Sequence, residues 1–276
     1  MNTTFELKDC HLSETIDYLA PLTSPLKGIV SIPHSGELIP KECLPFLTSD
    51  RRAVDEDIDY KVPSLIHIDK LRKAGIAIVI AKVHRAAIEL NRDEEATLLH
   101  WNENTQGVKL VCARPTAKLQ EEVIHRYYRP YYALLTTLIR SLEHSYAGKR
   151  VPFVDLHSMP SKPTAYHLKL NPNQKSYRAD FCISDLKGIS CEKEYIQMIT
   201  THFSCRGHKP AMNDPYFGGN ITKFAAKFTT NAIQIEINRS IYMDEEQKAL
   251  LPLEITNKIQ NDITDGLLQL FAKFSF

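Results

Sequence analysis

Short apolar runs rich in β-branched residues recur along this chain, separated by stretches in which apolar residues have a helical spacing. Such runs are typical of strands buried on both faces, as in parallel sheets, whose neighbouring strands are usually joined by helices. The alternation predicts an α/β fold with a mostly parallel or mixed central sheet covered by helices on both faces. The predicted strands are residues 28–33, 76–83, 151–156, 181–184 and 232–237.

The longest helical pattern covers residues 117–147, where apolar side chains repeat at three- and four-residue spacing. Pro130 should kink or split this helix, because proline lacks a backbone N–H and its ring clashes with the preceding turn. Shorter helices are predicted over residues 63–74, with Pro63 in the first turn, 190–204 and 253–274.

Composition favours one soluble domain over residues 1–276, because the chain has no repeat, low-complexity tract or Gly/Ser-rich linker. With 43% hydrophobic residues it can bury a large core without disulfides. The six cysteines contain no Cys-x-x-Cys pair, which argues against a cysteine zinc site, and we interpret them as mostly buried thiols. They are Cys10, Cys43, Cys112, Cys182, Cys191 and Cys205.

Charge and targeting signals point to a small-molecule partner. Lys and Arg (34) nearly balance Asp and Glu (33), so no long-range field favours nucleic acid or an anionic membrane. The N-terminus lacks the basic and apolar regions of a signal peptide, and no window resembles a membrane span. We therefore expect a cytoplasmic protein.

Chemically active side chains follow the predicted strands. In open α/β sheets, sites form beyond the carboxyl ends of strands, and there stand His34, Arg85 and His157. Catalytic zinc usually takes three protein ligands, and neutral imidazole is the commonest, so His34 and His157 are candidate ligands. The competing interpretation is that each histidine caps a strand end or packs in a hydrogen-bonded pocket.

The third ligand should be a carboxylate or another histidine, and the sequence offers two sources of a carboxylate. Glu37 stands three residues after His34, a spacing that places both side chains on one side of a turn. An acidic cluster ahead of Pro63 is the other source, and spacing alone leaves the choice open. The cluster consists of Asp55, Glu56, Asp57 and Asp59.

Glu236 interrupts an apolar run, Ile233 to Ile237. Strand alternation could place it on an exposed face beside Gln234 and Asn238. Desolvated near a metal, it would instead be a general base for water.

Other residues near the predicted strand ends could bind a substrate. A guanidinium can hold a carboxylate or an oxyanion, so arginines are candidates, and a double glycine makes either a turn or a close backbone approach to a ligand. These substrate-binding candidates are Ser35, Arg85, Arg92, Gly218, Gly219, Asn238 and Arg239.

Six segments in order carry a family resemblance: VSIPHSG (30–36), the Asp-rich segment leading to Leu65, Arg85 followed by ELNRD (89–93), VDLHSMP (154–160), NDPYFGGNIT (213–222) and IQIEINRSIYMDE (233–245). Together they resemble the N-formylglutamate amidohydrolase (N-formylglutamate deformylase) family over about residues 28–246. The resemblance implies a fold similar to that of the zinc exopeptidases and aspartoacylase, with one catalytic zinc.

The resemblance also implies roles for single residues. His34 and His157 match the family's metal histidines, and Glu236 matches its catalytic glutamate. For the carboxylate ligand, Asp57-Ile58-Asp59 looks like the deformylase Asp-x-Asp pattern, whereas His34 and Glu37 reproduce the carboxypeptidase His-x-x-Glu pair. We favour Asp59 and keep Glu37 open.

Asn91 and Arg92 resemble the Asn-Arg pair that grips a substrate carboxylate in the carboxypeptidases. Two departures bear on the substrate. Glu89 stands where family members often have Asp, and residues 161–178 match no pattern, although loops of this kind shape pockets.

The expected function is zinc-dependent hydrolysis of a small N-acyl amino acid, with N-formyl-L-glutamate yielding formate and glutamate. Arg85 would stabilise the oxyanion, and Asn91, Arg92 and Arg239 would bind carboxylates. One alternative is another zinc amidohydrolase or carboxypeptidase on the same scaffold. The other is a small-dicarboxylate binding protein that has lost catalysis, although a binder needs neither a metal nor a general base.

Overall fold

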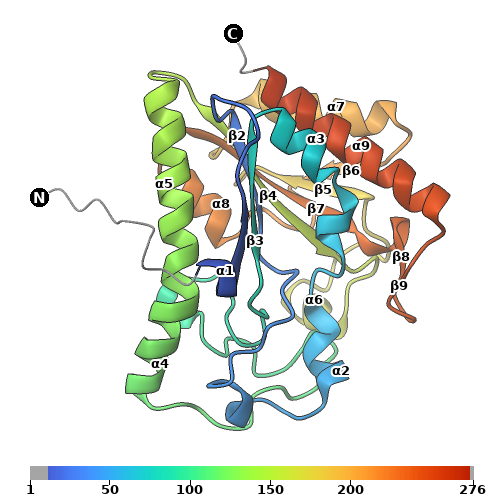
Figure 1. Cartoon of the computed structure of the whole chain (residues 1–276). Coiled ribbons are helices and arrows are strands. Elements are labelled where there is room, and N and C mark those ends of the chain that lie inside the picture. Colours follow the sequence, from blue (N-terminus) through green and yellow to red (C-terminus); the bar gives the residue numbers. More distant parts are fainter. Residues whose placement is uncertain (1–11, 274–276) are drawn as a thin grey trace, which may run out of the picture.

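The computed structural model describes residues 12–273, in which seven strands form one mixed sheet in the order β1-β3-β2-β4-β7-β5-β6 (Figure 1). Strand β2 pairs in parallel with β3 and β4, β4 with β7, and β5 with β6; β1 and β5 pair antiparallel with β3 and β7. The bounds are β1 (Ile16–Leu19), β2 (Gly28–Ile32), β3 (Ile76–Ala81), β4 (Val151–Met159), β5 (Phe181–Ser184), β6 (Pro210–Met212) and β7 (Thr230–Asn238).

The predicted α/β class and all five predicted strands are confirmed. The two strands that the sequence did not indicate, β1 and β6, are short and lie at the sheet edges. Burial provides little pattern there, because an edge strand of three or four residues packs few side chains.

The strand order creates a crevice between β2 and β4. The chain leaves β2 for β3 on one side and later returns to place β4 on the other side. At such a switch point the loops after the two strands diverge, and their carboxyl ends leave room for a ligand. His34, two residues after β2, and His157, near the end of β4, meet there.

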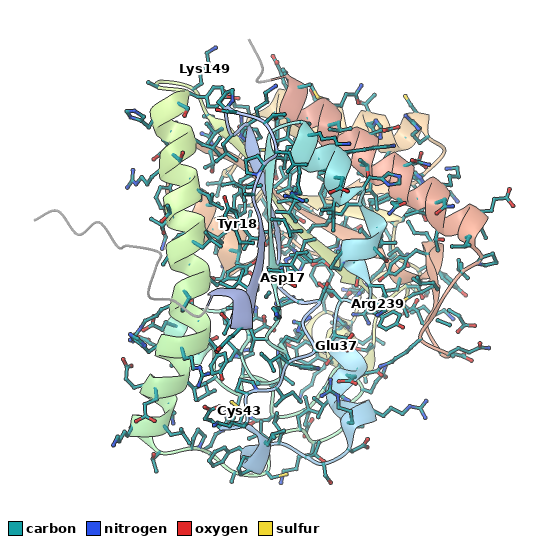
Figure 2. All side chains as sticks on the ribbon, in the orientation of Figure 1. Asp17, Tyr18, Glu37, Cys43, Lys149 and Arg239 are labelled. Carbon is teal, nitrogen blue, oxygen red and sulfur yellow. The ribbon has the colours of Figure 1, made fainter. Side chains whose placement is uncertain are left out.

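Helices cover both faces of the sheet (Figure 1). Helices α5 (Arg129–Ser145) and α8 (Asn220–Ala225) pack on one face, and α3 (Ile68–Lys73), α7 (Lys193–Cys205) and α9 (Leu253–Ala272) pack on the other. Side chains fill both layers (Figure 2). The remaining elements are α1 (Leu12–Thr15), α2 (Arg51–Val54), α4 (Ala117–Val123), α6 (Ala165–Leu170), β8 (Met243–Asp244) and β9 (Ala249–Leu250).

Alternation along the central strands assigns side chains to the two layers. Phe153 packs with the α5 and α8 layer, whereas Val154 packs with the α3, α7 and α9 layer. Because side chains alternate along a strand, His157 points to the same side as Phe153. Asp155 and His157 of β4 and Gln234 and Glu236 of β7 therefore share the face that α5 and α8 cover.

The predicted helix over residues 117–147 is split, as expected from Pro130. Helix α4 ends at Val123, a π-helical turn spans Ile124–Tyr128, and α5 begins at Arg129. The wider turn precedes the proline, which cannot donate an i→i−4 hydrogen bond.

The predicted helix over residues 63–74 forms only in its second half. Pro63 lies in a 3-10 turn, Val62–Leu65, and α3 begins at Ile68. The N–H of His67 donates to Thr264 Oγ1 of α9 at 2.8 Å. This N–H therefore bonds to α9 and does not take part in a helix that runs on from Pro63.

The five cysteines within the described residues are free thiols. Three are buried, Cys43, Cys182 and Cys191, while Cys112 and Cys205 are exposed. Cys10 lies outside the described residues. None of the helices between residues 12 and 273 has the length and apolar character needed to cross a membrane.

Candidate active site

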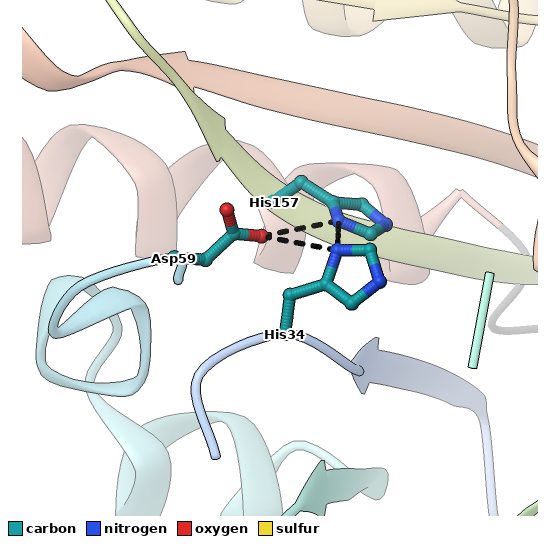
Figure 3. Close-up of side chains that lie close together, drawn as sticks. All are labelled: His34, Asp59 and His157. Carbon is teal, nitrogen blue, oxygen red and sulfur yellow. Dashed lines mark hydrogen bonds and ion pairs between the residues drawn. The ribbon is translucent and has the colours of Figure 1, made fainter. Parts of the chain in front are cut away.

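Three of the predicted metal ligands lie together (Figure 3). Nδ1 of His34 lies 3.1 Å from Nδ1 of His157. Asp59 Oδ2 lies 3.1 Å from Nδ1 of His157 and 3.7 Å from Nδ1 of His34. All three side chains are at most 4% exposed. Among the described residues they form a cluster whose ligand atoms could share one metal ion.

Asp59 reaches this cluster because its loop is fastened to the loop after β2. The N–H of Asp59 donates to the carbonyl of His34 at 2.9 Å, and Ser35 Oγ donates to the carbonyl of Asp59 at 2.9 Å. Its Oδ1 accepts a hydrogen bond from Ser158 Oγ at 3.3 Å, with Nη2 of Arg239 at 3.6 Å. Oδ1 is thus engaged, while Oδ2 faces the histidines.

Each histidine has a buried carboxylate behind it. Nε2 of His34 lies 2.5 Å from Glu89 Oε1. Nε2 of His157 lies 3.1 Å from Asp155 Oδ1, although outside hydrogen-bond alignment. A carboxylate at Nε2 favours the tautomer with its hydrogen on that nitrogen, which leaves the Nδ1 lone pair for a metal.

The cluster fits a tetrahedral metal such as zinc. Ligand atoms about 2.0–2.2 Å from a shared tetrahedral ion lie roughly 3.3–3.6 Å apart, close to the separations of the three atoms. Two Nδ1 lone pairs and a carboxylate oxygen directed at one point would repel each other, so either a metal ion or a proton on Nδ1 of His157, 3.1 Å from Asp59 Oδ2, must lie between them. Two imidazoles and one carboxylate are a donor set used in catalytic zinc sites.

The ionisation of the cluster follows from its charges. Burial opposes ionisation of Asp59, but its hydrogen bond and attraction to His157 hold its pKa below the usual value. Burial and Arg85 lower the pKa of His34. Burial also opposes protonation of His157, but Asp155 outweighs it and raises the pKa. The Asp59 carboxylate thus remains charged, as metal ligation requires.

Glu89 connects the metal cluster to the second half of the site. Besides His34, its carboxylate accepts hydrogen bonds from Nε and Nη2 of Arg85 at 3.2 and 2.7 Å and from Nε1 of Trp101 at 2.8 Å. The backbone N–H of Asn91 also donates to it, at 3.1 Å. Burial is thereby outweighed by Arg85, and the pKa of Glu89 lies well below its usual value.

Glu236 lies beside the cluster because of strand register. It is the register partner of His157 on the parallel neighbours β4 and β7. Its Oε1 accepts from Nε2 of Gln234 at 2.7 Å, and Gln234 Oε1 accepts from the N–H of Gly219 at 2.6 Å. Burial raises the pKa of Glu236 to about 7, partly offset by His157. Its side chain can therefore exchange a proton near neutral pH.

A cavity of about 470 Å³ opens over these groups. Its lining includes ten of the residues singled out from the sequence. They are His34, Asp59, Arg85, Asn91, Arg92, His157, Gly218, Gly219, Glu236 and Arg239.

The three arginines differ in their free hydrogen-bond donors. Arg239, labelled in Figure 2, donates from Nε, Nη1 and Nη2 to Ser158 and to the carbonyls of Glu56 and Ile58. Arg85 is similarly engaged with Glu89 and a backbone carbonyl. By contrast, no described residue forms a hydrogen bond with Nη2 of Arg92, which leaves that group available to a ligand.

The double glycine both turns the chain and permits a close approach. Gly218 has φ of +114°, in the region that favours glycine, and Gly219 precedes α8. A Cβ on Gly219 would overlap the side-chain amide of Asn91. The oxygen of that amide accepts from the N–H of Ile221 at 2.9 Å, so α8 and Asn91 are held together.

Three predicted residues lie outside the cavity lining. Glu37 is exposed and is not part of the metal cluster. Ser35 lies behind Asp59, bonded to its carbonyl. Asn238 uses Nδ2 to bond the carbonyls of Arg178 and Ala179, each at 3.1 Å. The geometry therefore gives Ser35 and Asn238 roles in holding loops.

Sequence reasoning assigned no role to Asp155, Glu89 or Gln234. A usable signal existed for two of them, since Asp155 and Gln234 stand two residues before His157 and Glu236 and so share their face of the sheet. Glu89 was noted only as a departure from the family within ELNRD, and no local signal shows that His34 and Trp101 meet its carboxylate in the fold.

Fold and site together define the class: an α/β protein with a buried candidate metal centre and an adjacent glutamate in a cavity at the carboxyl ends of its strands. The model of one family, N-formylglutamate amidohydrolase, matches residues 26–243. The chain belongs to this N-formylglutamate amidohydrolase family, as the sequence motifs predicted.

Solved structures confirm the fold. The crystal structure of N-formylglutamate amidohydrolase from Ralstonia eutropha JMP134 is similar, with a TM-score of 0.80, 24% identity and coverage of 94% of this chain and 97% of that chain. The gene product Atu2144 from Agrobacterium tumefaciens has a TM-score of 0.64 and 13% identity, covering 94% of each chain. Comparison with curated proteins gives no significant match.

Proposed function

We propose that this protein hydrolyses the amide bond of a small N-acyl amino acid, with N-formyl-L-glutamate as the leading substrate. The observation that carries the proposal is the arrangement of Glu236 beside the His34, Asp59 and His157 cluster within one cavity. Family membership supports an amidohydrolase and favours the formyl substrate.

In this proposal His34, Asp59 and His157 hold one divalent metal, zinc being our first expectation. When bound, the metal supplies Lewis acidity toward the acyl carbonyl and lowers the pKa of a bound water. Glu89 and Asp155 keep the histidine hydrogens on Nε2 and so hold the two rings as ligands.

Glu236 is the proposed general base. Its Oε1 is held by Gln234, while no described residue bonds Oε2, so Oε2 is free to accept a proton in the cavity. The same carboxyl would then deliver that proton to the departing amine nitrogen, which leaves as the amino acid. A pKa near neutrality suits both transfers.

Substrate binding is assigned to the arginine side of the cavity. Arg92 stacks over Trp101 at 5.2 Å and retains free N–H groups, so it is the first candidate for a substrate carboxylate, with Asn91 beside it. Arg85 would stabilise the oxyanion with the N–H groups that Glu89 does not engage. Arg239 acts by holding the Asp59 loop and adds positive charge.

Metal content and substrate choice test the proposal together. The untagged protein should contain about one zinc per chain, and His34→Ala and His157→Ala should contain little. His208→Ala is the matched control, because that histidine bonds Asp262 outside the cavity. Formyl-, acetyl- and peptide-linked glutamate should then be compared for hydrolysis. A folded parent that takes up no metal, or that cleaves none of these amides, would refute the proposal.

A further inference from the structure

An aromatic wall of the cavity contains three rings, those of Tyr166, His167 and Tyr216, that have so far received no role. Rings follow one another from Trp101 through Tyr166 and His167 to Tyr216, with centroid separations of 5.5, 5.6 and 6.2 Å. All four residues line the same cavity as Glu236. Two of them come from the segment 161–178, for which the sequence offered no interpretation.

The position of the hydrogen on the His167 ring follows from its contact with Thr164. The backbone N–H of Thr164 lies 3.2 Å from Nδ1 of His167, and the Thr164 hydroxyl oxygen lies 2.7 Å from the same nitrogen. A backbone N–H can only donate, so Nδ1 accepts and carries no hydrogen, and the hydroxyl can donate to it as well. Burial, followed by the charge of Arg178, lowers the pKa of His167 to about 4, so the ring is neutral at physiological pH. A neutral ring that accepts at Nδ1 carries its hydrogen on Nε2.

That hydrogen determines the state of Tyr216. Nε2 of His167 lies 3.0 Å from Tyr216 Oη and therefore donates to it. Nη1 of Arg178 donates to the same oxygen at 3.1 Å. With both donors directed at Oη, the hydrogen of the tyrosine hydroxyl finds no acceptor among the described residues.

The tyrosine is also fixed in place. Its carbonyl accepts from Ser184 Oγ at 2.8 Å, and Ser184 lies two residues along β5 from Cys182, the register partner of Glu236. Burial, the largest cause, raises the pKa of Tyr216 well above its usual value, so the hydroxyl remains protonated. The guanidinium at its oxygen makes the O–H a stronger donor and favours a negatively charged acceptor.

We propose that Tyr216 donates its hydroxyl hydrogen to an anionic oxygen of the bound substrate, with His167 and Arg178 as the residues that orient it. This inference rests on the proposed function. The acceptor is either a carboxylate oxygen of the amino-acid part or the oxygen that becomes negative as the acyl carbon turns tetrahedral. The two acceptors share the same chemistry and differ in the kinetic constant that they affect.

The experiment compares Tyr216→Phe with Tyr177→Phe. Tyr177 is the control, because its side chain is exposed and does not line this cavity. With N-formylglutamate, Tyr216→Phe should lower kcat/KM about 10- to 100-fold, while Tyr177→Phe matches the parent. A rise in KM alone identifies the carboxylate, and a fall in kcat alone identifies the oxyanion. Values of kcat and KM for Tyr216→Phe within about twofold of the parent overturn the inference.

A binding measurement separates this inference from the proposed function. The Kd of N-formylglutamate is measured by calorimetry in Glu236→Gln protein, with and without Tyr216→Phe. Weaker binding in the double variant supports a carboxylate contact, and equal binding with reduced kcat in Tyr216→Phe supports the oxyanion. Equal binding with unchanged kinetics overturns the inference alone. A parent that neither cleaves nor binds the compound overturns the proposed function and this inference with it.

Discussion

Replacing Glu89 by glutamine tests whether the carboxylate behind His34 prepares that histidine for metal. Glutamine has nearly the same shape but offers one oxygen and one NH₂ group. If the NH₂ takes the place of Oε2, it faces the N–H groups of Arg85 and Trp101. If it takes the place of Oε1, it faces Nε2 of His34 and the backbone N–H of Asn91.

The orientation with the NH₂ group toward His34 places fewer hydrogen-bond donors against each other. This orientation also affects the metal cluster. Nε2 of His34 must then accept a hydrogen bond, so its hydrogen moves to Nδ1, the atom that faces Asp59 and His157. A protonated Nδ1 cannot bind a metal. We expect Glu89→Gln to weaken zinc binding about 10- to 100-fold, which corresponds to roughly 1.4–2.7 kcal/mol.

Stability should also fall. Breaking a buried ion pair from one side costs about 3–5 kcal/mol. The Arg85 side chain is 17% exposed and keeps its bond to the carbonyl of Asp57, so we expect roughly 2–4 kcal/mol for the metal-free protein.

Zinc affinity is measured by competition with a chelator, and the free energy of unfolding of the metal-free protein by urea titration. The matched control is Glu94→Gln, whose exposed carboxylate pairs with Arg129 away from the cavity and should leave zinc binding unchanged. If Glu89→Gln binds zinc as tightly as the parent, the tautomer argument is refuted.

Three further predictions follow from single contacts. Gly219→Ala should displace the Asn91 amide and cost about 1–3 kcal/mol, whereas an unchanged thermal midpoint would show that the approach is not close. Burial opposes ionisation of Asp262, but hydrogen bonds from Lys258 and His208 lower its pKa. The difference in unfolding free energy between the parent and Asp262→Asn should therefore be largest above the ordinary pKa of 3.8 and decrease as the pH falls below it. Burial raises the pKa of Glu236 from 4.5 to about 7. The metal-free Glu236→Gln variant should therefore be as stable as the parent in acid and more stable by about 3 kcal/mol above neutral pH. A difference in unfolding free energy that stays the same at every pH in urea titrations would contradict this.

The parts of the fold that depend on local pattern were predictable. Short apolar runs indicate the buried strands. Because sites in α/β sheets form at the carboxyl ends of strands, His34 and His157 could then be predicted as site residues. The same alternation correctly placed Glu236 on the face of Gln234, but the expectation that this face could be exposed was wrong, since Glu236 is only 8% exposed. The sequence does not reveal that α8 and neighbouring loops roof that face.

Contacts between residues far apart in the sequence could not be predicted in this way. Spacing alone could not separate Asp59 from Glu37, because the answer depends on hydrogen bonds between two loops, His34 to Asp59 and Ser35 to Asp59. Glu89 has two partners near it in sequence, Arg85 and Asn91. Its contacts with His34 and Trp101 form only in the fold, and nothing in the local sequence specifies them.

The register between β4 and β7 has a consequence for how such a protein can diversify. Backbone bonds hold His157 and Glu236 on adjacent strands, whose spacing is about 4.8 Å in any sheet. Part of the facing wall instead comes from the segment 161–178, and surface segments of this kind generally tolerate insertion and exchange better than strands do. Under the proposed function, changes in that segment would alter which amino acid the cavity accepts, while the register keeps His157 and Glu236 side by side.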